Sequence, residues 1–386
     1  MKNENNHVNT AIIGCGGNMH GHIRAYKELW EKDIRACRIV AACDIDSELA
    51  AQTAMEIEEW QGSIPQTYSR IEDLLQGPED FEAVDISVPH DQHHLLALPC
   101  IDAGKHVTIE KPLGITMRTA KLILDAAEKS GKVFQVAENY RRSPSQRAIN
   151  WAIKSGRIGN LQQFYWIDVS KRLWLWGWRD VLSKAGGGWS MDGGVHFADL
   201  FRYHVGEVER LYAISKQYVK SRFRNREELT DPVEVDTEDT TMAVLTFENG
   251  VTGTWTSANS TLGQDFSNRI IYGDEGSLDF SEGIKTRTIE QSLENLTQEF
   301  MDQLSEEESE KLFPSGITNT IATELKEFYD AILYGSPIEI TAMEGYKDEA
   351  LSLALYESEL LGEPVKISDI EGLNIETYQN QFNQGL

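Results

Sequence analysis

No stretch of this sequence reaches the roughly 18 consecutive apolar residues that a membrane-spanning helix needs. The opening residues Met1–His7 are polar and lack the apolar core of a signal peptide. We therefore expect a cytoplasmic protein that has no membrane partner.

Positive charge is also scarce. The chain has 36 Lys and Arg residues against 62 Asp and Glu residues, which gives a formal net charge of −26. Such a surface repels the phosphates of nucleic acids and of anionic lipids, so we expect neither as a partner.

Cysteine is rare, and its four copies at 15, 37, 43 and 100 form no C-x-x-C pair. We expect buried, reduced thiols. Two histidine-containing stretches, His20 with His22 and His90 with His93 and His94, have no partners that complete a ligand set, so we predict no metal site.

The first third of the chain alternates short apolar runs with helical patterns. The helical pattern is clearest over 116–130, where Thr116 can cap the helix and Gly131 can end it. Such alternation predicts a parallel sheet covered by helices on both faces. The predicted strands cover residues 8–13, 38–43, 83–88, 106–109 and 133–137.

The remainder reads as an α+β domain with a mostly antiparallel sheet. Asn249-Gly250 separates two of its strands and is a hairpin signal. The predicted strands cover 163–169, 210–219, 240–247, 250–257 and 269–272, and the predicted helices cover 290–312, 320–334 and 344–361. We predict an α/β protein whose first domain is 1–140 and whose second is 141–386.

Gly14-Cys15-Gly16 follows the first strand and precedes a predicted helix. Gly14 suits the tight turn, and Gly16 lets the backbone approach a pyrophosphate at the helix N-terminus. Met19 occupies the third glycine position of this fingerprint. We expect it to push the helix away from the strand, unless Gly17 and Gly21 share the task.

Asp44 ends the second predicted strand. An acidic residue there binds the ribose hydroxyls of NAD and repels the additional phosphate of NADP, so we expect NAD. The alternative is that Asp44 only caps the next helix.

Two further motifs carry chemistry. Lys111 in Glu110-Lys111-Pro112 follows a strand and can steady a substrate hydroxyl as it loses its proton. Asp192, His196 and Asp199 would share one face if a helix begins near Asp192, and a carboxylate beside an imidazole suits a general base.

Together these residues resemble the Gfo/Idh/MocA (glucose–fructose oxidoreductase, inositol dehydrogenase, rhizopine catabolism) family. The matching motifs are Gly14-Cys15-Gly16 with His22, Asp44, Pro89 with His93, 103–107 before 110–112, Asp192-x-x-x-His196-x-x-Asp199, 327–332, Pro337 and Glu344-Gly345. His90, after Pro89, departs from the asparagine of many relatives, as Met19 departs from glycine.

The resemblance implies a Rossmann domain, then a domain with a large open sheet that commonly forms the oligomer interface, here of a homodimer or homotetramer. It implies hydride transfer between a sugar or cyclitol and the nicotinamide, with Lys111 and His196 in acid/base roles and Asp192 as partner of His196. We expect these residues to contact the cofactor: Gly14, Gly16, Gly17, Asn18, Met19, Asp44, Ser87, Pro89, His93, Glu110 and Lys111.

Trp174, Trp176 and Trp178 alternate as in a strand and could present their faces together to a pyranose ring. A core edge or an oligomer interface explains them equally well. No phosphate clamp is evident, which favours an unphosphorylated sugar, glycoside or inositol. The residues expected to contact this substrate are Trp176, Trp178, Arg179, Asp192, His196 and Tyr140.

Two alternatives to a sugar or inositol dehydrogenase remain. One is a glycoside hydrolase that retains NAD and oxidises the sugar transiently, which would accumulate no NADH. The other is a non-catalytic NAD-binding regulator, against which Lys111, Asp192 and His196 argue together.

Overall fold

The structure, a computed structural model, describes residues 7–383. Within them the chain folds into two compact units. The first unit takes in the chain up to Gly114, residues 119–142 and residues 306–345, and the second contains residues 115–118, 143–305 and the chain from 346 onward.

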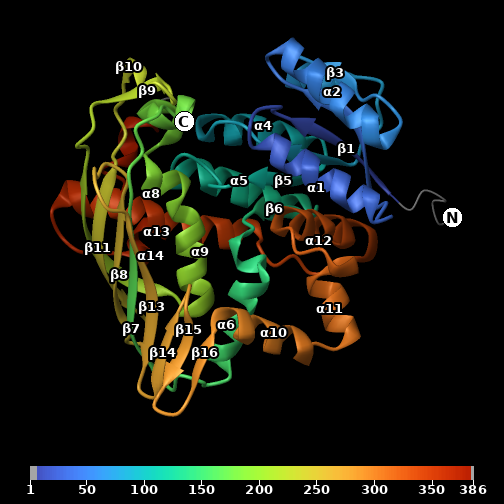
Figure 1. Cartoon of the computed structure of the whole chain (residues 1–386). Coiled ribbons are helices and arrows are strands. Elements are labelled where there is room, and N and C mark those ends of the chain that lie inside the picture. The colour runs from blue at the N-terminus through green and yellow to red at the C-terminus, as the bar shows by residue number, and fades with distance from the viewer. Residues whose placement is uncertain (1–6, 384–386) are drawn as a thin grey trace. The chain divides into compact units, whose positions relative to one another are not determined.

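The first unit is built on a six-stranded parallel sheet in the order β3-β2-β1-β4-β5-β6. The order reverses at β1, and open sheets of this kind bind ligands at that point. The strands are β1 Val8–Ile13, β2 Cys37–Cys43, β3 Gln66–Tyr68, β4 Ala83–Ile86, β5 His106–Glu110 and β6 Phe134–Ala137. The helices are α1 Met19–Glu31, α2 Ser47–Gln61, α3 Ile71–Gln76, α4 His93–Asp102, α5 Met117–Ser130, α11 Glu306–Leu312 and α12 Thr320–Tyr334 (Figure 1).

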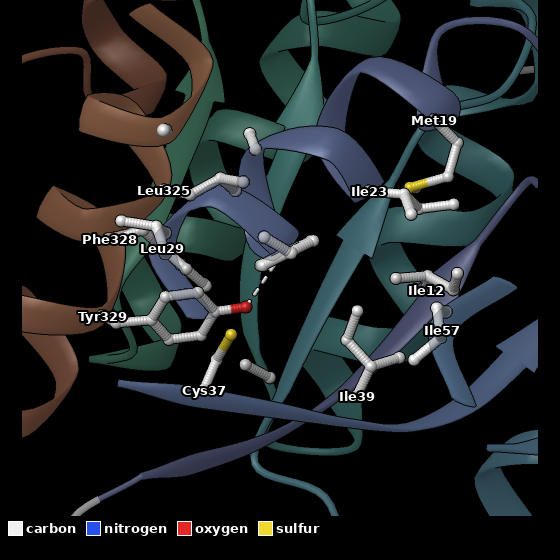
Figure 2. Close-up of a cluster of buried hydrophobic side chains, with 14 of the residues drawn as sticks. Ile12, Met19, Ile23, Leu29, Cys37, Ile39, Ile57, Leu325, Phe328 and Tyr329 are labelled. Atoms are coloured by element: carbon white, nitrogen blue, oxygen red, sulfur yellow. Dashed lines mark hydrogen bonds between the residues drawn. The ribbon is translucent and has the colours of Figure 1, made fainter. Parts of the chain in front are cut away.

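One hydrophobic cluster joins the start of the chain to α12 (Figure 2). Leu325, Phe328 and Tyr329 of α12 are fully buried against residues of α1 and the sheet. Segments some 300 residues apart therefore form one core. The predicted boundary near 140 assigned α12 to the second domain, whereas its apolar face packs with the first unit.

The second unit contains a nine-stranded sheet in the order β16-β15-β14-β13-β7-β12-β11-β8-β17, in which only β12 and β7 pair in parallel among the described residues. Its strands are β7 Leu161–Val169, β8 Val208–Lys216, β11 Thr240–Phe247, β12 Thr252–Ala258, β13 Phe266–Gly273, β14 Gly276–Asp279, β15 Gly283–Thr286, β16 Glu290–Ser292 and β17 Val365–Lys366. A separate hairpin pairs β9 Ser221–Asn225 with β10 Thr230–Glu234.

Helix α9 packs its aromatic side chains on this sheet. The ring of Phe201 lies 4.6 Å from that of Phe164 and 5.0 Å from that of Trp255, so aromatic contacts form the core here. The unit's helices are α6 Pro144–Lys154, α7 Leu182–Ala185, α8 Trp189–Asp192, α9 Gly194–His204, α10 Leu293–Gln303, α13 Ala342–Leu361 and α14 Ile367–Glu371.

The predicted fold class is confirmed: a Rossmann-like parallel sheet precedes a mixed, mostly antiparallel one. The Asn249-Gly250 hairpin is also confirmed, since β11 and β12 pair antiparallel on either side of it. The predicted alternation of Trp174, Trp176 and Trp178 along a strand is wrong. That segment is a loop followed by a 3₁₀ turn at Gly177–Asp180.

Candidate active site

Gly14 makes the turn between β1 and α1. Its φ is +84°, and a Cβ atom there would come within 2.1 Å of the Ser87 carbonyl oxygen at the end of β4. Only glycine fits this position. Gly16 and Gly17 have no heavy atom within 4 Å of their ideal Cβ positions, so their backbone is open to a ligand. The residues present therefore fit a pyrophosphate held by loop N–H groups.

Asp44 holds this loop to the end of β2. Its carboxylate accepts hydrogen bonds from the Cys15 N–H at 2.7 Å and from the Asp46 N–H at 2.8 Å. Helix α2 is capped by Asp46, whose side chain accepts from the N–H groups of Glu48 and Leu49. The alternative role of Asp44 as a helix cap is therefore wrong.

Met19 packs between α1 and the sheet, and its effect on the position of the helix stays a prediction. Its side chain is fully buried and belongs to the same hydrophobic cluster as Ile12 of β1 and Ile23 of α1 (Figure 2). Gly21 faces elsewhere, since a Cβ there would lie 3.3 Å from Ile321 of α12. The Met19 side chain therefore fills the space between α1 and β1, since methionine adapts to irregular gaps.

Beneath the loop, His22 lies between two carboxylates. Its Nδ1 is 2.8 Å from Asp85 Oδ2, and its Nε2 is 3.2 Å from Glu110 Oε1. Burial lowers the pKa of His22, but the charges and hydrogen bonds of Asp85 and Glu110 outweigh burial and hold that pKa well above its usual value. The imidazolium thus orients Glu110, the residue before Lys111. A charged residue within the apolar strand Ala83–Ile86 was a sequence signal for this ion pair.

His93 holds the segment that follows Lys111. It is fully buried, with Nδ1 at 2.7 Å from the Pro112 carbonyl oxygen and Nε2 at 3.1 Å from that of Val88. Burial lowers the pKa of His93 to about 3, so the ring is neutral and donates through one of its two nitrogens. These contacts connect the segment after β4 to the segment after β5, and the expected contact of His93 with the cofactor stays a prediction.

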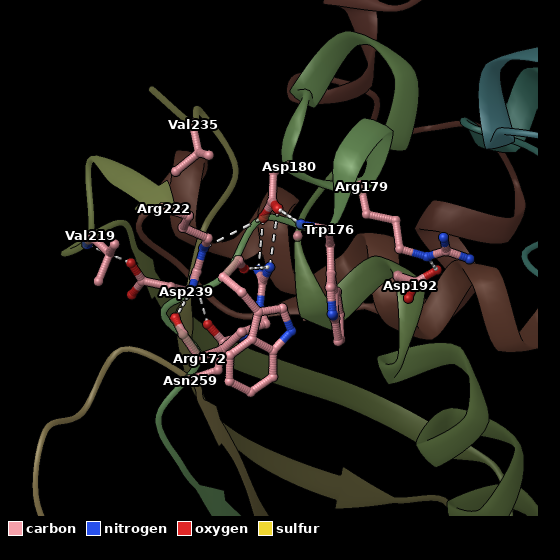
Figure 3. Close-up of polar contacts among 12 residues, drawn as sticks. Arg172, Trp176, Arg179, Asp180, Asp192, Val219, Arg222, Val235, Asp239 and Asn259 are labelled. Atoms are coloured by element: carbon pink, nitrogen blue, oxygen red, sulfur yellow. Dashed lines mark hydrogen bonds and ion pairs between the residues drawn. The ribbon is translucent and has the colours of Figure 1, made fainter. Parts of the chain in front are cut away.

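In the second unit, the predicted helix across Asp192, His196 and Asp199 is interrupted. Asp192 ends the short α8, and α9 begins at Gly194. Gly193 between them keeps a right-handed helical backbone, with φ −93° and ψ −26°, so the common face of the three residues stays a prediction. Residue 193 must be glycine, because a Cβ there would come within 2.5 Å of the Trp189 ring. Asp192 accepts a hydrogen bond from Arg179 Nε at 3.0 Å (Figure 3).

Glu238 holds the start of α8. Its carboxylate accepts hydrogen bonds from the Ser190 N–H at 2.9 Å and from the Gly188 N–H. Desolvation raises the pKa of Glu238 to about 7, against the lowering effect of these N–H groups. No sequence motif linked Glu238 to α8.

A cavity of about 670 Å³ lies beside α8 and α9 within the second unit. Its walls include Trp174 and Trp176 of the loop, Trp189 of α8 and Phe197 of α9. The Trp176 and Trp189 rings are 5.3 Å apart at an angle of 49°. Trp178, Arg179, Asp192 and His196 are not among its lining residues.

Two arginines of the cavity wall are paired with carboxylates. Arg172 donates two hydrogen bonds to the buried Asp180, at 2.8 and 3.1 Å, and its guanidinium lies 4.2 Å from the Trp176 ring centre (Figure 3). Arg269 is held by Asp168 in the same way. Asp180 therefore stabilises the wall of the cavity.

The structure thus groups the expected residues by unit. Glycines 14, 16 and 17, Met19, Asp44 and Ser87 surround the first loop, while Asp192 and Arg179 form a pair in the second unit. Sequence reasoning missed Asp85, Glu238, Trp189, Asn259 and Arg269, because long-range packing brings them to these places.

Within residues 7–383 no three Cys, His, Asp or Glu side chains cluster as metal ligands would. Among the same residues, no helix is both long and apolar enough to cross a bilayer.

Comparison with known proteins identifies the two parts of the chain. Residues 8–138 match the model of the oxidoreductase family described as an NAD-binding Rossmann fold, and residues 147–279 match the GFO/IDH/MocA C-terminal domain. The first part is therefore an NAD-binding domain.

Among curated proteins, levoglucosan dehydrogenase from Pseudarthrobacter phenanthrenivorans is 30% identical over 298 residues, which cover 71% of this chain and 73% of that one. D-Apiose dehydrogenase from Paraburkholderia graminis is 30% identical over 63% of this chain and 58% of its own length.

Among solved structures, levoglucosan dehydrogenase in complex with NADH and L-sorbose shares the fold. It superposes with a TM-score of 0.76 over 94% of this chain and 99% of that one, at 24% identity. The chain belongs to the Gfo/Idh/MocA oxidoreductase family.

Proposed function

We propose that this protein is a dehydrogenase that oxidises a secondary alcohol of an unphosphorylated sugar, sugar derivative or inositol and prefers NAD to NADP. The observation that carries the proposal is the Arg179–Asp192 ion pair, in which Asp192 ends α8, the helix whose Trp189 lines the cavity. Sugar dehydrogenases among the relatives support it.

In this proposal His196 accepts the proton of the substrate hydroxyl, and Lys111 stabilises the developing alkoxide. Arg179 orients Asp192, so Asp192 can accept a hydrogen bond from a second substrate hydroxyl or act as the partner of His196. Bound NAD supplies the hydride acceptor. The anionic Asp44 carboxylate at the end of β2 favours ribose hydroxyls over a 2′-phosphate.

The test is a screen of sugars, glycosides and inositols with NAD that follows both NADH absorbance and aglycone release. We expect NADH to accumulate, and Lys111→Ala and His196→Ala to lower kcat by about 10²–10⁴-fold. Lys121→Ala, at an exposed lysine on α5, is the matched control and should keep full activity. Unchanged activity in both site variants would refute the residue assignment, and aglycone release without NADH would favour the redox-assisted glycosidase.

A further inference from the structure

The tryptophan cavity of the second unit is separate from the residues proposed to transfer the proton. It is lined by Trp174, Trp176 and Trp189, but not by Asp192 or His196. A sugar ring that fills this cavity is therefore not the ring placed against the reacting groups, although Trp189 and Asp192 share the four-residue helix α8.

We infer that the cavity binds a second, non-reacting sugar ring, so that the preferred substrate is a disaccharide or a glycoside with a ring-shaped aglycone. This inference rests on the proposed function, because it takes Asp192 and His196 as the groups that face the oxidised ring. The cavity's volume of about 670 Å³ lies within the roughly 300–1,000 Å³ of pockets that bury ligands larger than a monosaccharide.

The cavity's aromatic surfaces suit a pyranose ring. Indole faces pack on the apolar C–H faces of sugars, and their N–H groups can donate at the edge. The rings are held in place: the Arg172 guanidinium lies 4.2 Å from the Trp176 ring centre, and the Arg226 guanidinium lies 4.1 Å from that of Trp174. Fixed aromatic surfaces lose little entropy when a ligand binds.

The charges of the wall balance, which favours an uncharged ligand. Lys171, Arg172 and Arg269 are matched in number by Asp168, Asp265 and the neighbouring Asp180. Arg172 is paired with Asp180 and Arg269 with Asp168, so neither guanidinium is left to bind an anionic group. Asn259 adds a neutral polar group that is fixed through its Oδ1, which accepts from Arg222 Nη2 at 2.7 Å. An amide of fixed orientation beside indole faces suits a polyhydroxylated, uncharged ring.

Binding energy from a non-reacting ring can also accelerate the reaction. When remote contacts hold the substrate in place, part of their energy lowers the barrier at the reacting carbon. We therefore expect the second ring to raise kcat/KM and not only to lower KM.

The experiment compares matched sugars: glucose with methyl glucoside, cellobiose and maltose, and galactose with methyl galactoside and lactose. Turnover is followed by NADH absorbance. Binding is measured by isothermal titration calorimetry with NADH-loaded protein, which cannot oxidise the sugar. In at least one series, the disaccharide should exceed its monosaccharide at least tenfold in kcat/KM and should bind more tightly.

Trp174→Ala should reduce this disaccharide-to-monosaccharide ratio of kcat/KM by about tenfold, and Trp174→Phe, which keeps a smaller ring, should reduce it less. The thermal midpoint of each variant verifies folding. Trp60→Phe, at a tryptophan of α2 in the first unit, is the matched control and should leave the ratio unchanged.

Equal kcat/KM for disaccharide and monosaccharide in every series, or no binding of any disaccharide, would overturn the inference. An equal fall for both sugars in Trp174→Ala would do the same, because the cavity would then hold the reacting ring. Tight disaccharide binding without any NADH formation would support the cavity and reject the proposed dehydrogenase instead.

Discussion

At the residue scale, Asp44 is the carboxylate on which cofactor choice is expected to depend. It binds the N–H groups of Cys15 and Asp46, and so it lies against the glycine loop. Asp44→Asn keeps an oxygen to accept a hydrogen bond but removes the negative charge.

We predict that Asp44→Asn lowers the NAD-to-NADP ratio of kcat/KM by about ten- to a hundredfold, since a hydrogen bond to a charged group contributes about 1.5–3 kcal/mol. Steady-state kinetics with both cofactors measures the ratio. Asp46→Asn, which keeps a helix-capping side chain two residues away, should leave it nearly unchanged. A ratio that does not move in Asp44→Asn would argue that another group selects the cofactor.

A second residue-scale prediction concerns Glu238, whose pKa is raised to about 7 mainly by desolvation. The folded protein therefore holds this proton more tightly than the unfolded chain does. Stability from this group is fully present below about pH 4.5 and is lost as the pH rises toward 7.

Glu238→Gln cannot ionise, and its one amide oxygen can accept only one of the two backbone hydrogen bonds. We therefore expect the Tm of the variant, relative to that of the wild type, to rise between pH 5 and pH 8, by about 2–4 °C for each kcal/mol of wild-type stability lost. Thermal unfolding of both proteins across this pH range gives the difference. If the difference in Tm between the two proteins did not change with pH, Glu238 would not titrate in this range.

At the scale of elements, Met19 joins α1 to the sheet. The side chain is fully buried in a cluster that includes Ile12 and Ile23. We predict that Met19→Ala lowers the free energy of unfolding by about 2–5 kcal/mol because it leaves a cavity.

Met55→Ala on α2 removes the same side chain at a position that is 53% exposed, and it should change the free energy of unfolding by less than about 0.5 kcal/mol. Urea denaturation of both variants makes the comparison. If both variants lowered the free energy of unfolding by the same amount, the packing of α1 would not depend on Met19.

Local patterns predicted many elements well. The period of apolar residues placed α12 over 320–334 as the structure has it, and Asn249-Gly250 correctly predicted a hairpin. Where tertiary contacts decide, local patterns failed. The Arg172–Asp180 pair and the Asp180–Trp176 hydrogen bond accompany a loop where alternating tryptophans predicted a strand.

The same limit applies to the candidate site. Gly14, Asp44 and Lys111 could be proposed because each follows a strand, and parallel strands bring such residues to one edge of the sheet. Glu238 and Asn259 could not be proposed, since their partners lie 48 and 37 residues away along the chain.

At the scale of the whole molecule, the first unit is assembled from separate parts of the chain. Tyr329 of α12 donates to or accepts from the hydroxyls of Tyr26 and Thr10, at 2.9 and 3.0 Å, inside the first unit. Without residues 306–345 the hydroxyls of Tyr26 and Thr10 would lose Tyr329, and the apolar cluster around them would be exposed to solvent.

We predict that a fragment ending at Arg142 shows no cooperative thermal transition and binds a hydrophobic dye, because its core is incomplete. The control joins the same fragment to residues 306–345 through a flexible linker and should restore the transition. Circular dichroism and dye fluorescence provide the measurements. A cooperative transition in the shorter fragment would show that α12 is dispensable for the unit.

The discontinuous first unit also imposes a delay on the newly made chain. After Arg142 leaves the ribosome, about 200 further residues must be added before Gly345 completes the unit. At roughly 5–20 residues per second this takes about 10–40 s. During that interval the apolar faces of α1 and β1 are not yet covered by α12. We therefore expect a ribosome-associated chaperone to bind the chain mainly while its second unit is being translated.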